Sequence, residues 1–180
     1  MRKGLSAVVA VLLVARGLAA EQQVPAHTLR AAFLYNFAKF AEWPADSVAA
    51  GRLTLCVLGD DSVADALVET TRDRTIDGRA IIVSRVKADG ALRGCHLLYV
   101  TGLDLKHTAQ LLAYLKDASV FTVSDQEQFA KAGGIAELFV ESGKMRFAVN
   151  VDAAQRAHLH ISSRLLSLAK LVKDERSVQR

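Results

Sequence analysis

The sequence predicts an α/β fold with three layers around a mainly parallel β-sheet, together with a C-terminal β-hairpin and flanking helices. Four short runs are almost entirely apolar, as is typical of strands that a parallel sheet buries on both faces. Segments of about ten residues with helical periodicity alternate with these runs, which favours βα units. After the glycine pair at 133–134, residues 135–140 and 145–150 alternate and predict the hairpin. Together these patterns indicate a Rossmann-like architecture.

Residues 1–19 have the features of a secretory signal peptide. A basic start, an apolar stretch at 5–15 and small residues before a cleavage site after Ala19 match that pattern. Arg16 interrupts the apolar stretch before it reaches the roughly 20 residues that a membrane span needs. We therefore expect export with cleavage, and a single α/β domain at residues 20–180.

Cleavage changes the charge of the protein. The full chain has a formal net charge of +4, and Arg2, Lys3 and Arg16 leave with the signal peptide. The remaining charge is close to +1, which gives no electrostatic footprint for nucleic acid. We therefore expect no nucleic-acid partner.

The aromatic residues concentrate in one helix, which we expect at Leu29–Pro44, with Thr28 capping its start and Pro44 stopping it. Its apolar positions recur at helical spacing and form one broad face. The aromatic side chains in this stretch are Phe33, Tyr35, Phe37, Phe40 and Trp43. We expect this face to pack against the sheet, and an exposed partner-binding helix is the alternative.

The other elements follow in chain order. We expect strands at 53–58, 80–86, 97–100 and 120–123, the hairpin described above, and helices at 61–71, 103–115, 126–132, 152–156 and 162–173. The caps of these helices are predicted at Asp61 or Ser62, at Asp125 and at Ser162. In the helix at 103–115, the residues predicted to face the core are Leu105, Ala109, Leu112 and Leu115.

The chain has two cysteines, Cys56 in the first predicted strand and Cys95 just before the third. In an exported protein of this size a disulfide between them is the favoured interpretation, and the common 2-1-3 strand order would make their strands neighbours. The register of a parallel strand pair could instead separate them and leave two free thiols. A metal or catalytic role is least favoured, because adjacent strand residues such as Cys95 and His96 point to opposite faces.

Other motifs offer little binding chemistry. His158 and His160 are spaced like metal ligands on a strand, but no further ligands lie nearby, so we interpret them as surface or core residues. The turn Gly59–Ser62 lies where a doubly wound sheet would receive a phosphate, yet it has two carboxylates and no glycine-rich motif. We expect neither a metal nor a cofactor.

The sequence holds no pattern typical of a catalytic centre. No serine lies in a G-x-S-x-G motif, and Ser124–Asp125 is better explained as a helix cap. Only an unexpected convergence of Asp60, His96 and His107 would support an enzyme. We therefore expect a protein without enzymatic activity.

A series of short motifs matches a known family. They are FLYNFAKFAEWP at 33–44, LCVLG at 55–59, GRAIIV at 78–83, GCH at 94–96, TVSD at 122–125, Phe129 with GGI at 133–135, MRFAVN at 145–150 and a segment at 153–169 that ends in ISSRLLSLA. With these motifs in this order, the chain resembles the YfiR family of periplasmic proteins over nearly all of its mature length.

The resemblance implies a periplasmic α/β domain, commonly dimeric, with a disulfide at the positions of Cys56 and Cys95. It also implies a repressor that binds the periplasmic sensor domain of an inner-membrane diguanylate cyclase and lowers cyclic di-GMP and biofilm formation. A peptidoglycan-associated outer-membrane lipoprotein can sequester such repressors. The chain departs from the family in lacking a second cysteine pair, and in having Ala148 where the family often has Glu. Partner contacts there are expected to differ.

Residues near the hairpin and the last turns are the predicted partner-binding residues, namely Arg146, Asn150, Arg156 and Arg164. Each also has a structural interpretation: the arginines as solvated charges, and Asn150 as a helix cap. An alternative hypothesis is a periplasmic small-molecule receptor that serves another membrane sensor such as a histidine kinase. Its ligand would bind at the carboxyl ends of the strands, near Gly59 or Ser124.

Overall fold

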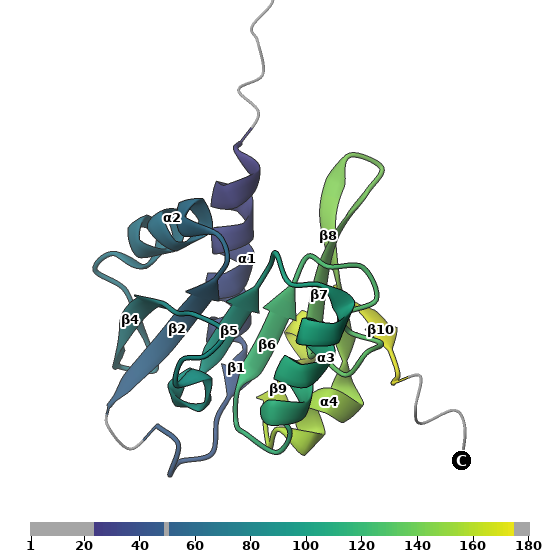
Figure 1. Cartoon of the computed structure of the whole chain (residues 1–180). Coiled ribbons are helices and arrows are strands. Elements are labelled where there is room, and N and C mark those ends of the chain that lie inside the picture. Colours follow the sequence, from purple (N-terminus) through teal and green to yellow (C-terminus); the bar gives the residue numbers. More distant parts are fainter. Residues whose placement is uncertain (1–23, 49–50, 175–180) are drawn as a thin grey trace, which may run out of the picture.

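The computed structural model describes residues 24–48 and 51–174, so the predicted signal peptide lies outside the described residues. At its centre is an eight-stranded sheet in the order β10-β8-β7-β6-β5-β2-β4-β3 (Figure 1). These strands are β2 (Arg52–Leu58), β3 (Thr75–Ile76), β4 (Arg79–Arg85), β5 (Leu97–Val100), β6 (Phe121–Ser124), β7 (Ala136–Glu141), β8 (Lys144–Asn150) and β10 (Lys170–Val172). A separate antiparallel pair consists of β1 (Ala41–Glu42) and β9 (His160–Ile161). The predicted α/β class with a mainly parallel sheet and a hairpin is confirmed.

The helices are α1 (Ala26–Lys39), α2 (Asp61–Thr71), α3 (Leu105–Tyr114), α4 (Val151–Arg156) and α5 (Ser163–Leu166), with a short 3-10 helix η1 (Leu92–Gly94). Helices α1 and α2 contribute to the larger core on one face of the sheet, whereas α3 covers a smaller core on the other face. Strand β2 lies between β4 and β5 and is parallel to both, which confirms the predicted 2-1-3 order. The carboxyl ends of the parallel strands therefore meet at one edge of the sheet.

Helix α1 packs its aromatic face into the larger core, as predicted. The ring of Phe37 is fully buried and lies 5.7 Å from that of Phe121 on β6 and 5.1 Å from that of Phe147 on β8. Phe33 also contacts Phe147, at 5.8 Å between ring centroids. The helix thus joins the parallel part of the sheet to the hairpin.

The predicted ends of this helix are wrong. It begins at Ala26 without a side-chain cap, so Thr28 does not cap it, and it ends at Lys39, before Pro44. The cause is a long-range strand pair: the backbone N–H of Ser162 donates to the carbonyl of Phe40, and Ala41 then pairs with Ile161. Sequence spacing could not reveal that pair.

The predicted helix at 126–132 is also wrong, because the segment 125–133 forms successive turns. Asp125 caps nothing there; instead the hydroxyl of Ser124 accepts from the backbone N–H of Gln126. The carboxylate of Glu137 accepts from the N–H groups of Gln128 and Ala130. These side-chain acceptors, two to nine residues away in sequence, take some of the N–H groups that helical carbonyls would otherwise take.

The predictions for residues 162–173 and for the core-facing side of α3 were wrong in part. Residues 162–173 form only the short helix α5, capped by Ser162 as predicted, and then strand β10, which pairs in parallel with β8. In α3, Leu111 and Leu115 are buried as part of the smaller core, whereas Leu105 is 73% exposed and Ala109 is exposed. The core-facing side of α3 was therefore only partly predicted.

Replacing Gly134 with alanine should destabilise the fold. An added Cβ would lie 2.1 Å from the buried ring of Phe129, so one of the two must move. We expect Gly134→Ala to lower the free energy of unfolding by about 1–3 kcal/mol, as for other overpacked cores. Urea denaturation measures this, with Gly94→Ala as the control, because a Cβ there meets nothing within 4 Å. Equal stability of the two variants would contradict the packing argument.

Candidate functional site

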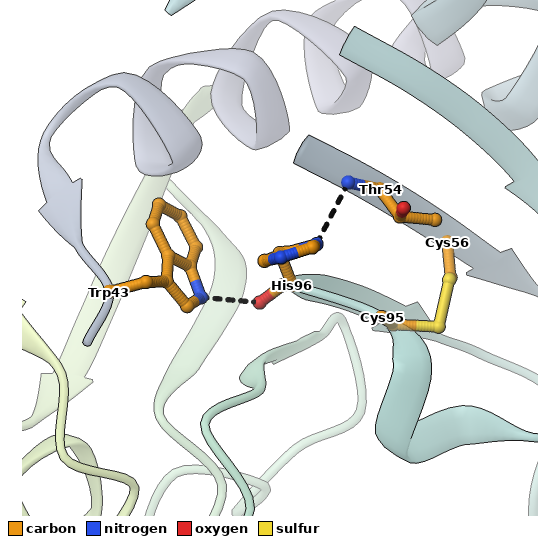
Figure 2. Close-up of a disulfide and its surroundings, with 5 residues drawn as sticks. All are labelled: Trp43, Thr54, Cys56, Cys95 and His96. Atoms are coloured by element: carbon orange, nitrogen blue, oxygen red, sulfur yellow. Dashed lines mark hydrogen bonds between the residues drawn. A yellow bond between two sulfur atoms is a disulfide. The ribbon is translucent and has the colours of Figure 1, made fainter. Parts of the chain in front are cut away.

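The two cysteines form a disulfide that crosslinks β2 to the segment before β5 (Figure 2). Residue Cys56 pairs in register with Leu98, three positions after Cys95, so a straight strand would hold the cysteines apart. The 3-10 helix η1 directly precedes Cys95 and sets its Cα atom 5.8 Å from that of Cys56. Both cysteines are buried in the smaller core. The structure thus has the disulfide and not two free thiols.

The side chain of His96 hydrogen-bonds to backbone groups and forms no catalytic dyad with Cys95. Its Nδ1 atom accepts from the N–H of Thr54 at 2.9 Å, so Nε2 carries the proton and donates to the carbonyl of Ser47 at 2.9 Å. The indole Nε1 of Trp43 donates to the carbonyl of His96 (Figure 2). Both ring nitrogens are thus used to tie the loop after α1 to β2, which leaves neither for acid–base chemistry.

The other suggested catalytic residues do not converge. Asp60 accepts from the N–H of Val63 and caps α2. His107, on α3, bonds to Asp104, and the hydrogen bond from its backbone N–H is the main cause that lowers the pKa of that carboxyl. Each of these groups, like His96, serves its own local structure.

The described residues contain no group of three or more His, Cys, Asp or Glu side chains that could hold a metal ion. His158 lies in the turn after α4 and is exposed, while His160 lies on β9 opposite Glu42. Within the same residues, no helix is both long and apolar enough to cross a membrane.

The carboxyl edge of the parallel strands carries a polar cluster instead of an open ligand site. Arg30 on α1 forms an ion pair with Asp125 at 2.9 Å, and the hydroxyl of Thr101 donates to the same carboxylate. A Cβ on Gly59 would lie 2.2 Å from the carbonyl oxygen of Thr101, so the chain is closely packed here. Burial raises the pKa of the neighbouring Tyr99 phenol. Arg30 was not predicted, because only the packing of α1 brings it to this edge, and Tyr99 was predicted only as part of the apolar strand β5.

The four predicted partner-binding residues do not form one site. Asn150 is fully buried: its amide oxygen caps α4, and its Nδ2 donates to the carbonyl of Ala130 and to Asp174. Arg156 forms an ion pair with the same Asp174 at 2.7 Å. Arg164 is exposed on α5, and Arg146 is exposed on β8. None of the four is in the lining of the groove described next, but Arg146 lies opposite Phe139, which lines it.

The hairpin extends beyond the rest of the sheet (Figure 1). Strand β7 pairs with β6 only through Ala136 and Glu137, and β10 pairs only with residues 148–150 of β8. Residues 138–147 therefore form a two-stranded projection, in which Val140 is 69% exposed. A projecting ribbon with an exposed apolar residue is suited to contact with another molecule.

A groove of about 480 Å³ lies beside this projection, between β7, β8, β10 and the turns at 125–131. No helix residue lines it. The apolar side chains in its lining include Phe139, Ala148 and Val172. We call it the cationic groove, because Lys131 and Lys170 line it, and Arg146 lies directly opposite Phe139 on the same side of the hairpin.

The lining of the cationic groove carries charges of both signs, with Lys131 and Lys170 beside Asp125, Glu127 and Glu137. Within the described part of the chain, Lys131, Arg146 and Lys170 form no ion pair. Of the acidic groups in the lining, Asp125 forms its ion pair with Arg30, Glu137 accepts backbone hydrogen bonds, and Glu127 is exposed. The groove thus combines apolar side chains with three bordering cations that form no ion pair among the described residues. Lys170 was not predicted as a groove residue, because it lies in the segment 162–173 that was predicted to be a helix.

Comparison with known proteins points to one family. A family model described as YfiR/HmsC-like matches residues 27–170. The solved structure of a conserved domain protein from Vibrio cholerae O1 biovar El Tor superposes with a TM-score of 0.53 at 10% sequence identity. The alignment covers 84% of this chain and 61% of that one, and at this identity it shows a shared fold alone. A search among curated proteins found no match.

Removing the disulfide should destabilise the protein without preventing a compact α/β core. The bridge closes a loop with a sequence separation of 39, for which the chain-entropy estimate is about 4 kcal/mol. We expect the double variant Cys56→Ala and Cys95→Ala to lose free energy of unfolding on that order in guanidinium denaturation. A reductant should destabilise the wild type similarly and leave the double variant unchanged. Destabilisation of the variant by reductant would show that the effect lies elsewhere.

Proposed function

Because the chain belongs to the YfiR/HmsC-like family, whose members are periplasmic regulators of diguanylate cyclase signalling, we propose that it binds and represses such a cyclase. In this proposal the partner is the periplasmic sensor domain of an inner-membrane diguanylate cyclase. Binding lowers cyclic di-GMP and with it biofilm formation. The family's role is regulatory, which supports action by contact with a partner.

The cationic groove is the observation that supports this proposal most directly. A binder represses a sensor domain if it prefers the inactive state, and the shift equals its difference in affinity for the two states. The unpaired cations Lys131, Arg146 and Lys170 offer such a difference when the partner presents acidic side chains in one state only. Apolar contact with Phe139 and the exposed Val140 adds affinity.

Position 148 changes the charge of the groove, because this chain has alanine where the family often has glutamate. Ala148 on β8 lines the groove. It lies opposite Glu137 of β7 on one side and opposite Lys170 of β10 on the other. A glutamate there, as is common in the family, would place a negative charge beside Lys170. In this chain that charge is missing, so we infer that its partner carries a more acidic matching segment.

We also propose a second partner, which would relieve the repression. A peptidoglycan-associated outer-membrane lipoprotein that binds this repressor would compete with the cyclase and release it. Arg164, exposed on α5 and outside the cationic groove, is a proposed contact for such a second partner.

Reversing the charge of the groove should weaken binding to the cyclase domain. We expect the double variant Arg146→Glu and Lys170→Glu to bind at least 10-fold more weakly in a titration, since losing complementary charge costs more than a kcal/mol. The control is Arg52→Glu with Lys87→Glu, two exposed cations on the β2–β4 side of the sheet, which should leave the affinity unchanged. Equal weakening by both variants would indicate a non-specific charge effect and refute the groove.

A small-molecule receptor is the second candidate function, and one observation favours it. Within the described residues, the buried Nε of Arg30 has no hydrogen-bond partner, and the buried hydroxyl of Tyr99 lies beside the carboxylate of Asp125 without a hydrogen bond of ordinary geometry. Both are donors near Asp125, at the edge where α/β sheets bind ligands.

Thermal-shift measurements separate the two functions. For a repressor we expect the purified cyclase domain to raise the melting temperature and a library of small metabolites to leave it unchanged. A receptor would show the reverse, and Tyr99→Phe would then abolish the shift caused by the metabolite. That result would overturn the proposed repressor function.

A further inference from the structure

The hairpin has an unpaired backbone edge along β7. Strand β6 pairs with β7 only as far as Glu137, and no strand among the described residues pairs with 138–141 on the side away from β8. The turns and loops of the described chain form no backbone hydrogen bond with these four residues either. At the usual rise of a strand they span about 13 Å. We call this side of residues 138–141 the open edge.

The turn of the hairpin determines which residues of β7 bond to β8. Ser142 and Gly143 both have positive φ, 51° and 73°, as in a two-residue type I′ turn. A hydrogen-bonded pair closes such a turn, and here that pair is Glu141 and Lys144. Hydrogen-bonded pairs recur at every second position of an antiparallel ladder. The odd-numbered residues of β7 therefore bond to β8.

The even-numbered residues of β7 point their backbone groups the other way. Val140 is one of them, so its N–H and C=O are directed to the open edge. The far end of the ladder has the same phase, because the N–H of Asn150 donates to the carbonyl of the odd-numbered Ile135 at 2.9 Å. Met145, directly opposite Val140, points its own backbone groups to the outer edge of β8. Val140 thus offers one donor and one acceptor to a neighbouring extended chain.

The open edge runs along the cationic groove. Leu138, Phe139 and Val140 all line the groove, and the turns at 125–131 form another of its walls. The side chains of a strand added here would alternate between the two faces of the sheet. On one face they would lie next to the half-buried Phe139, and on the other next to the side chain of Val140, which is 69% exposed. An added strand would thus have an apolar neighbour on both faces.

We propose that the protein binds its partner by strand addition, in which an extended, acidic segment of the partner pairs with the open edge at Val140 and lies in the cationic groove. This inference rests on the proposed function, which supplies the protein partner. In strand addition the backbone hydrogen bonds give affinity, and the side chains at alternate positions give specificity. An extended polypeptide is the occupant whose regular donors and acceptors match those of a strand edge.

The charges around the groove favour an acidic segment. Two acidic groups of the lining are already engaged, Asp125 by Arg30 and Glu137 by backbone N–H groups. The remaining acidic group of the lining is the exposed Glu127. Among the described residues, the three bordering cations form no ion pair, and they are Lys131, Arg146 and Lys170. An acidic side chain on the groove face of the added strand meets this excess of positive charge.

Amide hydrogen exchange, followed by NMR, tests the strand addition. We expect the purified periplasmic domain of the cyclase to slow exchange of the Val140 amide at least about 10-fold, because the added strand accepts a hydrogen bond from it. The amide of Met145, at the opposite edge of the hairpin, is the internal control and should exchange at an unchanged rate. Binding that leaves the Val140 amide unprotected would overturn strand addition and leave the proposed function in place. Absence of any binding would overturn both.

The same measurement on the protein alone tests the other occupant of this edge, a second copy of the chain. We expect exchange of the Val140 amide to be independent of protein concentration when the cyclase domain is absent. Protection that rises with concentration would place a second copy at the open edge and overturn the proposal.

A proline at position 140 gives a second readout. Val140→Pro removes an amide that faces the open edge and leaves every hydrogen bond to β8, and proline is tolerated at such positions of an edge strand. We expect Val140→Pro to bind the cyclase domain about 10-fold more weakly in a titration, as the loss of one hydrogen bond implies. The matched control is Val140→Ala, which shortens the side chain but keeps the amide and should bind more tightly than the proline variant. Circular dichroism should show both variants folded. Equal affinities of the two variants would mean that the amide is not used, and would overturn the proposal.

Discussion

The packing of Phe37 is the contact on which the rest of the structure depends. Its ring lies between Phe121 of the parallel sheet and Phe147 of the hairpin, so one buried side chain joins the two parts of the fold. Burying a phenylalanine contributes up to about 3 kcal/mol. The same helix brings Arg30 to Asp125 at the carboxyl edge. The position of α1 therefore determines how the parallel sheet packs against the hairpin. It also determines which polar groups meet at that edge.

Local sequence features predicted the parallel half of the sheet well. The apolar runs at β2, β5 and β6 could be predicted without knowledge of distant residues, because each strand is largely buried. The predicted cap of α2, Asp61 or Ser62, was wrong, because the carboxylate of the preceding Asp60 accepts from the N–H of Val63. Predictions failed where a distant partner decides the backbone. Residues 170–172 have helical spacing but become a strand because β8 offers a free edge. The turns at 125–133 exist because Glu137 supplies the acceptors.

The candidate site was predictable only in part for the same reason. The disulfide followed from two cysteines and a plausible strand order, and Arg146 followed from its place on the hairpin. The groove beside Arg146 could not be predicted, because one wall is β10 and another is the irregular segment 125–131. Asn150 was chosen for its position near the hairpin, yet its buried amide organises α4 and the chain around Asp174.

The projecting hairpin also has a bearing on solubility. Where β7 and β8 extend past their neighbours, both outer edges of the ribbon expose backbone donors and acceptors that another extended chain could pair with. Glu141, Lys144 and Arg146 place charges along this stretch, and Lys170 places one on the edge strand β10. Charged side chains on open edges oppose uncontrolled strand addition and fibre formation. The cations of the proposed binding groove thus also oppose aggregation of the folded protein with its own copies.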